Sequence, residues 1–364
     1  MPEKNKWDRG IDFKRNISIM MIVIGLAIIG FIIFEITLES KRPNHSVENL
    51  TGNWMDVHGV GIYSAEDASD NNNNSLYLAT HHGLYKKDMG DNSSSSSSNA
   101  SGWVQVGSDK SDLMGFTIDP STEGVMYSSG HPPTGGNLGF RISNDYGVTW
   151  QKVSDVTSPK PIDFHTMTVG NNPEIIYAAS GMGDNIFISA DGGKNWTITS
   201  PPLKGQQVVT LASNQSNSNN VYAATTGGIY TSIDQGKSWQ KVMNNELFNG
   251  DNSTNLMVTG IEISPDGKTA YAFVAPSQVD GDGKTGYIIK STDGAKTWTK
   301  TDGQISGAVF VSKFAFGNNG DVYTALIQDS PQTGVAASVF STDDDGKTWT
   351  LEGTNNKSLA EIYT

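Results

Sequence analysis

Residues 143–150 read SNDYGVTW, and close variants of this stretch recur four times further along the chain. The copies are SADGGKNW at 189–196, SIDQGKSW at 232–239, STDGAKTW at 291–298 and STDDDGKTW at 341–349. Each copy places a serine and an aspartate ahead of a glycine or alanine, and each ends on tryptophan. Such repetition predicts structural units that stack side by side, because a short repeat cannot bury its own apolar face.

The spacing of the repeats indicates the size of each unit. The tryptophans that end the five stretches are 46, 43, 59 and 51 residues apart, and Trp103 lies 47 residues before Trp150. These lengths suit a four-stranded sheet with its turns, which is one blade of a β-propeller. Tyrosines hold one equivalent position in successive units: Tyr77, Tyr127, Tyr177, Tyr222, Tyr271 and Tyr323. The sequence therefore predicts an all-β, six-bladed β-propeller over residues 54–357, with seven blades as the alternative.

The repeated stretch resembles the Asp box of BNR-repeat propellers, whose pattern is Ser-x-Asp-x-Gly-x-x-Trp. Ala295 replaces the glycine in one copy, and an inserted residue separates Asp343 from Gly346 in the last. The aspartate can accept hydrogen bonds from its own turn, the glycine permits φ > 0, and the tryptophan can fill the space between blades. We therefore assign a structural role to the box residues. They are Asp145, Trp150, Asp191, Trp196, Asp234, Trp239, Asp293, Trp298, Asp343 and Trp349.

An apolar, uncharged run at 17–34 precedes the repeats. With its flanks it is long enough to cross a hydrocarbon core of about 30 Å. More basic residues precede the run than follow it closely, so the positive-inside tendency leaves the N-terminus in the cytoplasm. We expect a cell-membrane protein with an extracytoplasmic propeller and an uncleaved anchor, a removed signal peptide being the alternative. Its segments would be a cytoplasmic tail at 1–16, a transmembrane helix at 17–38, a polar stalk at 39–53, the propeller at 54–357 and a C-terminal tail at 358–364.

The composition is consistent with an extracytoplasmic location. The chain has no cysteine, which excludes a disulfide framework and a thiol nucleophile. Its net charge of −13 disfavours nucleic acid as a partner. Glycosylation sequons are frequent, which predicts a surface glycoprotein if the host glycosylates. They begin at Asn44, Asn49, Asn73, Asn92, Asn99, Asn195, Asn214, Asn252 and Asn356.

Histidines gather in the first three units. The first strands of these units read DVHGVGI, DLMGFTI and DFHTMTV, with an aspartate two residues before a histidine or methionine. Residues two apart on a strand share one face. These pairs are Asp56 with His58, Asp112 with Met114, and Asp163 with His165. His81 and His131 each lie four residues after the repeated tyrosine, and Met182 lies five after it.

Propeller topology brings the start of each first strand and the loop after each second strand to the same mouth of the central channel. The sequence therefore predicts one metal or ligand site at that mouth, formed by His58, His81, His131, His165, Met114 and Met182. Imidazoles oriented by carboxylates suit zinc or iron, and the methionines favour copper. The alternatives are an ion-free mouth that binds a sugar or another polar ligand, and histidines that share no site.

The resemblance to Asp-box propellers also implies hydrolase activity, since the class includes sialidases and other glycoside hydrolases. Sialidases hold the substrate carboxylate with three arginines, whereas Arg141 is the single arginine of residues 54–357, which argues against a sialidase. A different glycosidase would need two carboxyl groups across the scissile bond. Asp56, Asp112 and Asp163 are the catalytic candidates.

A narrower resemblance, carried by VHGVGI, ATHHGLY, MGF, SSGHP and DFHTM, is to glycosylhydrolase-like surface proteins of bacteria and archaea. Sortilin-type receptors and photosystem assembly factors share the repeat, which implies a third class, a protein-binding platform. We interpret the chain as a propeller that binds a glycan, a small ligand or a protein at one face. Glycoside hydrolysis and a purely protein-binding role remain the alternatives.

Overall fold

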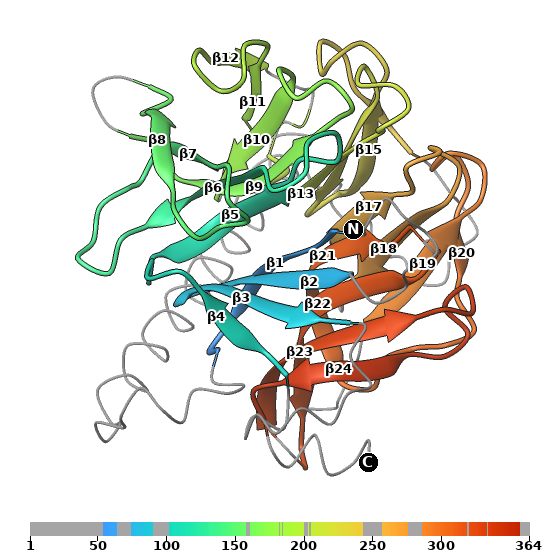
Figure 1. The fold of residues 1–364 in the computed structure, drawn as a ribbon. Helices are drawn as coiled ribbons and strands as arrows, with labels where there is room; N and C mark the ends of the chain where they lie inside the picture. Colours follow the sequence, from blue (N-terminus) through green and yellow to red (C-terminus); the bar gives the residue numbers. More distant parts are fainter. Residues whose placement is uncertain are drawn as a thin grey trace, which may run out of the picture. The chain divides into compact units, whose positions relative to one another are not determined.

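The computed structural model describes residues 54–63, 74–89, 102–157, 161–181, 183, 185–199, 203, 205–242, 257–275, 286–318, 320–332 and 334–356. These residues form six antiparallel sheets of four strands each, and within every sheet the strands follow chain order (Figure 1). The innermost strand of each sheet lies against the innermost strands of its neighbours, and β21 lies against β1. The prediction of a six-bladed, all-β propeller is confirmed.

The strand bounds are as follows. Blade 1 contains β1 (Val57–Tyr63), β2 (Ser75–Thr80), β3 (Gly83–Asp88) and β4 (Val104–Val106). Blade 2 contains β5 (Asp112–Ile118), β6 (Met126–His131), β7 (Phe140–Ser143) and β8 (Gln151–Ser154). Blade 3 contains β9 (Phe164–Val169), β10 (Ile176–Ser180), β11 (Ile186–Ser189) and β12 (Thr197–Thr199). Blade 4 contains β13 (Val208–Ser213), β14 (Val221–Thr225), β15 (Gly228–Ser232) and β16 (Gln240–Lys241). Blade 5 contains β17 (Val258–Ile263), β18 (Ala270–Val274), β19 (Tyr287–Ser291) and β20 (Thr299–Lys300). Blade 6 contains β21 (Ala308–Phe316), β22 (Val322–Ser330), β23 (Gly334–Thr342) and β24 (Thr350–Thr354).

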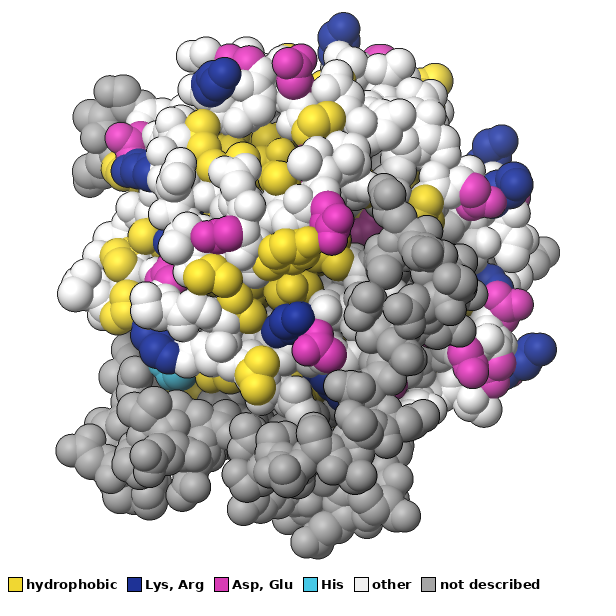
Figure 2. Space-filling view, in the orientation of Figure 1, with side chains coloured by type: hydrophobic (Ala, Val, Ile, Leu, Met, Phe, Trp, Pro, Cys, Tyr) yellow, Lys and Arg dark blue, Asp and Glu magenta, His cyan; other side chains and the backbone are white. Residues whose placement is uncertain are grey.

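Burial changes from the axis to the rim of each blade. The second strands are almost continuously buried, as in β14 and β18, because neighbouring blades cover both of their faces. Outermost strands such as β16 and β20 are two residues long and exposed. Short polar edge strands leave little unpaired backbone for association with another chain. On the face drawn in Figure 2, charged side chains of both signs are interspersed, with hydrophobic side chains among them.

The Asp boxes form the turns between the third and fourth strands, as expected. Asp191 shows the pattern: its Oδ1 accepts hydrogen bonds from the Ser189 hydroxyl (2.9 Å) and from the backbone N–H of Asn195 (2.9 Å). These bonds, chiefly those from Asn195, lower the pKa of Asp191 to about 2. Trp239 and Trp298 are buried in apolar clusters that combine residues of two neighbouring blades. The box therefore shapes the turn and joins neighbouring blades.

The assignment of Asp343 as the box aspartate of blade 6 is wrong. Asp344 takes that role, since its Oδ1 accepts hydrogen bonds from the Thr342 hydroxyl (2.9 Å) and the backbone N–H of Thr348 (2.9 Å). A threonine hydroxyl thus replaces the usual serine, and the last box has no inserted residue. The two residues after every box aspartate have positive φ, including Ala295 at 63°.

Replacing Asp344 with asparagine should lower the denaturant midpoint of unfolding at pH 7, whereas Asp343→Asn should leave it unchanged. Hydrogen bonds from Thr348 lower the pKa of Asp344 to about 2, below the value near 3.9 expected in an unfolded chain. A lowered folded-state pKa gives stability that is present above the unfolded value and is lost as pH falls through the folded value. The difference between wild type and Asp344→Asn should therefore shrink between about pH 4 and pH 2. A larger loss in Asp343→Asn than in Asp344→Asn at pH 7 would restore Asp343 as the box residue.

The ring closes without a shared strand. Trp54, just before β1, donates from Nε1 to the carbonyl oxygen of Ala337 in β23 at 3.3 Å. Asn355, just after β24, donates from Nδ2 to the carbonyl oxygen of Trp54 at 2.8 Å. One apolar cluster joins the two blades and contains Trp54, Tyr85 and Trp103 from blade 1 with Tyr323 and Val339 from blade 6. Side-chain packing and these hydrogen bonds hold the last blade to the first.

Within the described residues, no helix is long and apolar enough to cross a membrane. The predicted transmembrane helix at 17–38, with the tails and stalk around it, lies outside the described residues, and so does Met182. These assignments stay predictions.

Candidate ligand site at the channel mouth

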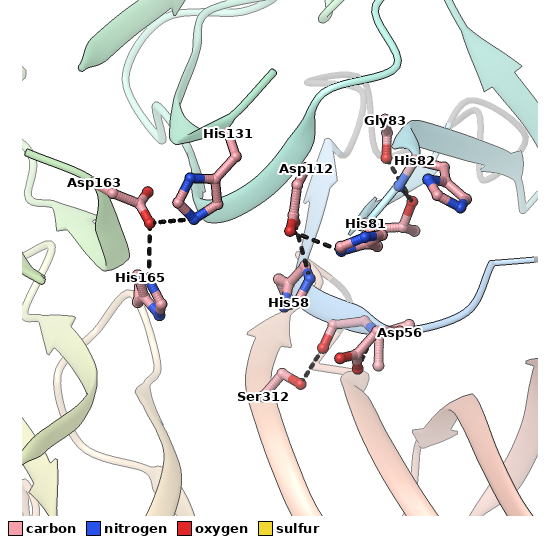
Figure 3. Close-up of polar contacts among 12 residues, drawn as sticks. Asp56, His58, His81, His82, Gly83, Asp112, His131, Asp163, His165 and Ser312 are labelled. Atoms are coloured by element: carbon pink, nitrogen blue, oxygen red, sulfur yellow. Dashed lines mark hydrogen bonds and ion pairs between the residues drawn. The ribbon is translucent and has the colours of Figure 1, made fainter. Parts of the chain in front are cut away.

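The four predicted histidines of blades 1 to 3 and the neighbouring aspartates lie at one mouth of the channel (Figure 3). His58 lies in β1, His81 in the turn after β2, Asp112 at the start of β5 and His131 at the end of β6. Asp163 directly precedes β9, which contains His165. First strands begin, and second strands end, at the same side of the propeller. The Asp boxes follow third strands and therefore lie at the opposite side.

A local irregularity at this mouth changes the direction of its side chains. In β1 the pairing with β2 shifts between Val57 and Gly59, so His58 is an extra residue in the ladder. In β9 the pairing with β10 shifts at Phe164, which makes His165 the corresponding extra residue. Such bulges disrupt the regular alternation of faces and re-aim side chains. For this reason, residues two apart need not share a face here.

Two histidines meet Asp112, and we call this set the Asp112 triad. Nε2 of His58 lies 3.1 Å from Oδ1 of Asp112, and Nδ1 of His81 lies 2.7 Å from Oδ2. The side chains of His58 and Asp112 are 13% and 11% exposed, whereas His81 is 35% exposed. Each carboxylate oxygen therefore faces one imidazole from the preceding blade.

Two other histidines meet Asp163, and we call this set the Asp163 triad. Nε2 of His131 and Nε2 of His165 lie 2.7 and 2.8 Å from the same oxygen, Oδ2. Nδ1 of His131 also lies 3.0 Å from the carbonyl oxygen of Gly136. The Asp163 side chain is 9% exposed. Its Oδ1 is buried and has no hydrogen-bond partner among the described residues.

The two triads are related by one step of the repeat. His81 and His131 occupy equivalent positions, and each contacts the aspartate of the following blade. The other imidazole differs in origin, because Met114 stands in blade 2 where His58 stands in blade 1. His165 of blade 3 supplies the second imidazole of the Asp163 triad instead.

The triads alter the charges of their members. Burial raises the pKa of Asp112, but hydrogen bonds and charge from His58 and His81 outweigh this effect, so the pKa falls below its ordinary value. The pKa of Asp163 is lowered in the same way by His131 and His165, against the effect of burial. The hydrogen bond to Asp163 raises the pKa of His131 to about 9. Both aspartates are therefore carboxylates at neutral pH.

Three expectations about this mouth need correction. Asp56 does not orient His58: its Oδ1 accepts a hydrogen bond from the backbone N–H of Val57 (2.8 Å), and His58 faces Asp112 instead. The four imidazoles do not converge on one point, because their donor atoms divide into two groups, within each of which all ligand atoms lie within 4.8 Å. The aspartates lie among the imidazoles, so they are potential ligands as well as orienting groups.

Two charged residues inside the channel were not predicted from the sequence. Lys313 in β21 is buried, and its Nζ donates to the carbonyl oxygens of Phe116 and Met167, both at 3.3 Å. Burial raises the pKa of Glu262 in β17 to about 7, against the effect of the positive charge of Lys313. Both residues line a pocket of about 90 Å³ that the first strands of all six blades surround. The available signal was a single charged residue in each of two otherwise uncharged first strands.

Arg141 has an internal partner. Its Nη1 donates to Oδ2 of Asp109 at 2.7 Å, and its guanidinium lies over the ring of Trp150 at 5.3 Å from the centroid. The side chain is 8% exposed. This arginine stabilises blade 2 and has no direct access to a ligand.

Comparisons with known proteins agree with the fold. Residues 139–244 and 184–313 match the family model Sortilin-Vps10, described as "Sortilin, neurotensin receptor 3". The resemblance to Asp-box propellers is confirmed. A xyloglucanase of Paenibacillus sp. is 29% identical over 111 residues, which are 30% of this chain and 11% of that protein. This Asp-box propeller thus spans a small part of the length of its curated relative.

Solved structures of GH74 enzymes share the fold. The GH74 xyloglucanase from Xanthomonas campestris superposes with a TM-score of 0.54 at 16% identity, over 83% of this chain and 46% of that one. An ancestral GH74 enzyme gives a TM-score of 0.50 at 18% identity, over 84% of this chain and 39% of that one. At such identities the similarity concerns the fold alone.

Proposed function

We propose that this chain is a membrane-anchored, extracytoplasmic propeller that binds a glycan at the mouth formed by the Asp112 and Asp163 triads, without hydrolysing it. One observation carries the proposal: each aspartate of the mouth is engaged by two imidazoles and has a lowered pKa. The apolar segment at 17–34 supports the anchor, and the basic residues that precede it support its orientation.

Glycoside hydrolysis requires a pair of carboxyl groups in different protonation states. One must stay protonated near neutral pH to donate to the leaving group, which takes a raised pKa. Asp112 and Asp163 both have lowered pKa values, so neither suits the role of general acid. Asp56, the third candidate, accepts a hydrogen bond from the backbone N–H of the next residue, Val57. The mouth therefore fits binding better than bond cleavage.

The glycan ligand is supported by chemistry and by the relatives. Half-exposed imidazoles beside carboxylates offer both donors and acceptors, which suits the hydroxyl groups of a sugar. The curated relative and one of the solved structures are named as xyloglucanases. This chain spans less than half of those solved structures, so their activity is not carried over to it. Xyloglucan oligosaccharides are thus the first ligands to test.

Intact cells that express the full chain should bind a fluorescent xyloglucan oligosaccharide and release no new reducing ends. Protease added outside the cells should abolish binding if the propeller is extracytoplasmic. Asp163→Asn should weaken binding about tenfold or more, because His131 and His165 lose their charged partner. Asp266→Asn is the matched control, since Asp266 is exposed in the turn between β17 and β18 at the opposite side.

Three outcomes would contradict the proposal. Release of reducing ends that Asp112→Asn or Asp163→Asn abolishes would make the chain a hydrolase. Binding that appears only after the cells are permeabilised, with the propeller protected from external protease, would place the propeller inside. If a screen of cell-surface glycans gave no ligand while a protein partner bound the same face, the protein-binding alternative would replace the glycan.

A further inference from the structure

We propose that each triad binds one divalent transition-metal ion, with Zn²⁺ as the best-fitting ion, so that the mouth holds two ions rather than one. The inference rests on the proposed function only in taking this mouth as the ligand-binding face of the propeller. The two triads have identical donor sets, namely two imidazole nitrogens and one carboxylate.

The strongest observation is the arrangement of donors and acceptors at His131. The carbonyl oxygen of Gly136 only accepts hydrogen bonds, so Nδ1 of His131 carries a hydrogen. In a neutral ring Nε2 then presents a lone pair, yet it lies 2.7 Å from a carboxylate oxygen of Asp163, which is also an acceptor. A cation must lie between these two atoms, either a second proton or a metal ion. A backbone carbonyl that fixes the tautomer is the usual support behind a metal-bound histidine.

The carboxylate of Asp163 points to the same conclusion. Its Oδ2 meets both imidazoles, while its buried Oδ1 has no hydrogen-bond partner among the described residues. Burying a carboxylate oxygen without a partner is costly. A metal ion bound to this carboxylate would neutralise its charge, which is consistent with an aspartate placed at 9% exposure between two histidines.

The dimensions of the triads fit one ion each. Ligand atoms bound to one Zn²⁺ at about 2.0 to 2.1 Å lie about 3.4 Å apart in a tetrahedral site. The ligand atoms of each triad already lie within 4.8 Å of one another, with nitrogen–oxygen distances of 2.7 to 3.1 Å. Small side-chain rotations are therefore enough. Three protein ligands leave a fourth position open, and the half-exposed His81, His131 and His165 place it toward solvent, where a glycan hydroxyl could bind.

The ligand types favour zinc over other ions. Two imidazoles with one carboxylate are nitrogen-rich, whereas Ca²⁺ and Mg²⁺ prefer oxygen ligands throughout. Iron(II) also binds such sets, and zinc differs in accepting tetrahedral geometry without redox change. Copper(II) also binds imidazole-rich sets, and it differs from zinc in preferring square-planar or tetragonal geometry.

Metal content measured on the full chain in detergent, dialysed against Zn²⁺ without any glycan, tests the inference directly. We expect about two Zn²⁺ per wild-type chain, and about one after His81→Ala or after His131→Ala, because each change removes a ligand from one triad only. The combined variant should retain almost none. His82→Ala is the matched control, since it removes an imidazole adjacent to His81 that belongs to neither triad.

A titration of the wild-type chain with Co²⁺ provides a second readout that needs no variant. Visible absorption bands typical of four-coordinate Co²⁺ should saturate at about two equivalents and disappear when Zn²⁺ is added. No bound metal, or two ions unaffected by His81→Ala and His131→Ala, would overturn the inference. A wild-type chain that binds one ion, with no ion bound in either variant, would overturn it in favour of a single shared site. Glycan binding without metal would leave the proposed function intact while excluding the ions.

Discussion

Trp298→Ala is expected to lower the free energy of unfolding by about 3 to 5 kcal/mol, the usual range for removing a large buried aromatic ring. Trp298 is 2% exposed and lies in an apolar cluster with Tyr222 of blade 4 and Ile289 of blade 5. Its Nε1 donates to the carbonyl oxygen of Ala295 at 3.2 Å. The substitution would leave a cavity between two blades and remove the hydrogen bond that holds the box turn.

Trp150→Ala is the matched control for this prediction. Trp150 occupies the same box position in blade 2 but is only partly buried, and Arg141 covers its ring. A partly exposed ring loses less on truncation, so the denaturant midpoint should fall less than in Trp298→Ala. Equal losses measured by chemical unfolding would mean that burial between blades is not what makes the box tryptophan important.

Gly130→Ala should lower the free energy of unfolding by about 2 to 6 kcal/mol. This loss is the sum of backbone strain and overpacking, which cost about 1 to 3 kcal/mol each. Gly130 has a φ of +145°, and a Cβ there would lie 1.9 Å from the carbonyl oxygen of Asp112. The strand that carries Asp112 must therefore move, which should also weaken Zn²⁺ binding at the Asp112 triad.

Gly135→Ala separates the two contributions. Gly135 also has a positive φ, of +81°, but a Cβ there would meet nothing within 4 Å. Gly135→Ala should therefore lower the free energy of unfolding only by the backbone strain, about 1 to 3 kcal/mol. Thermal or denaturant unfolding of both variants measures the difference. If the two losses are equal, the contact with Asp112 contributes nothing.

The sequence predicts the fold well because its signals are local and repeated. Tryptophan spacing gave the blade length, and the repeated tyrosine gave the number of blades. The box of blade 6 was misassigned because the pattern was matched on serine, whereas the hydroxyl of Thr342 performs the same bonding. The full pattern hydroxyl-x-Asp-x-Gly-x-x-Trp finds Asp344, because only Thr342 and Asp344 stand at the usual spacing from Gly346 and Trp349.

The predicted histidines lie at one mouth and the expected contact of His165 with Asp163 is observed, but the other imidazole–carboxylate contacts were not predicted. The expected pair of Asp56 and His58 assumes regular alternation, which the bulge at His58 interrupts. The observed partner, Asp112, belongs to the next blade, and contacts between blades depend on how the sheets are placed in three dimensions. The periodicity of the sequence predicts that a residue lies at a mouth of the channel. It does not predict which residue of the neighbouring blade its side chain contacts.

The way the ring closes gives the molecule one seam. Every other pair of neighbouring blades is joined by the chain itself, whereas blades 6 and 1 are held together by side chains and by the bonds of Trp54 with Ala337 and Asn355. The ring can part there without breaking the chain or separating two paired strands. Such a parting would expose the apolar surface around Trp54 and Tyr323 before any sheet is disrupted. Since the chain enters and leaves the ring at this same point, tension applied to either end of the propeller reaches the seam first.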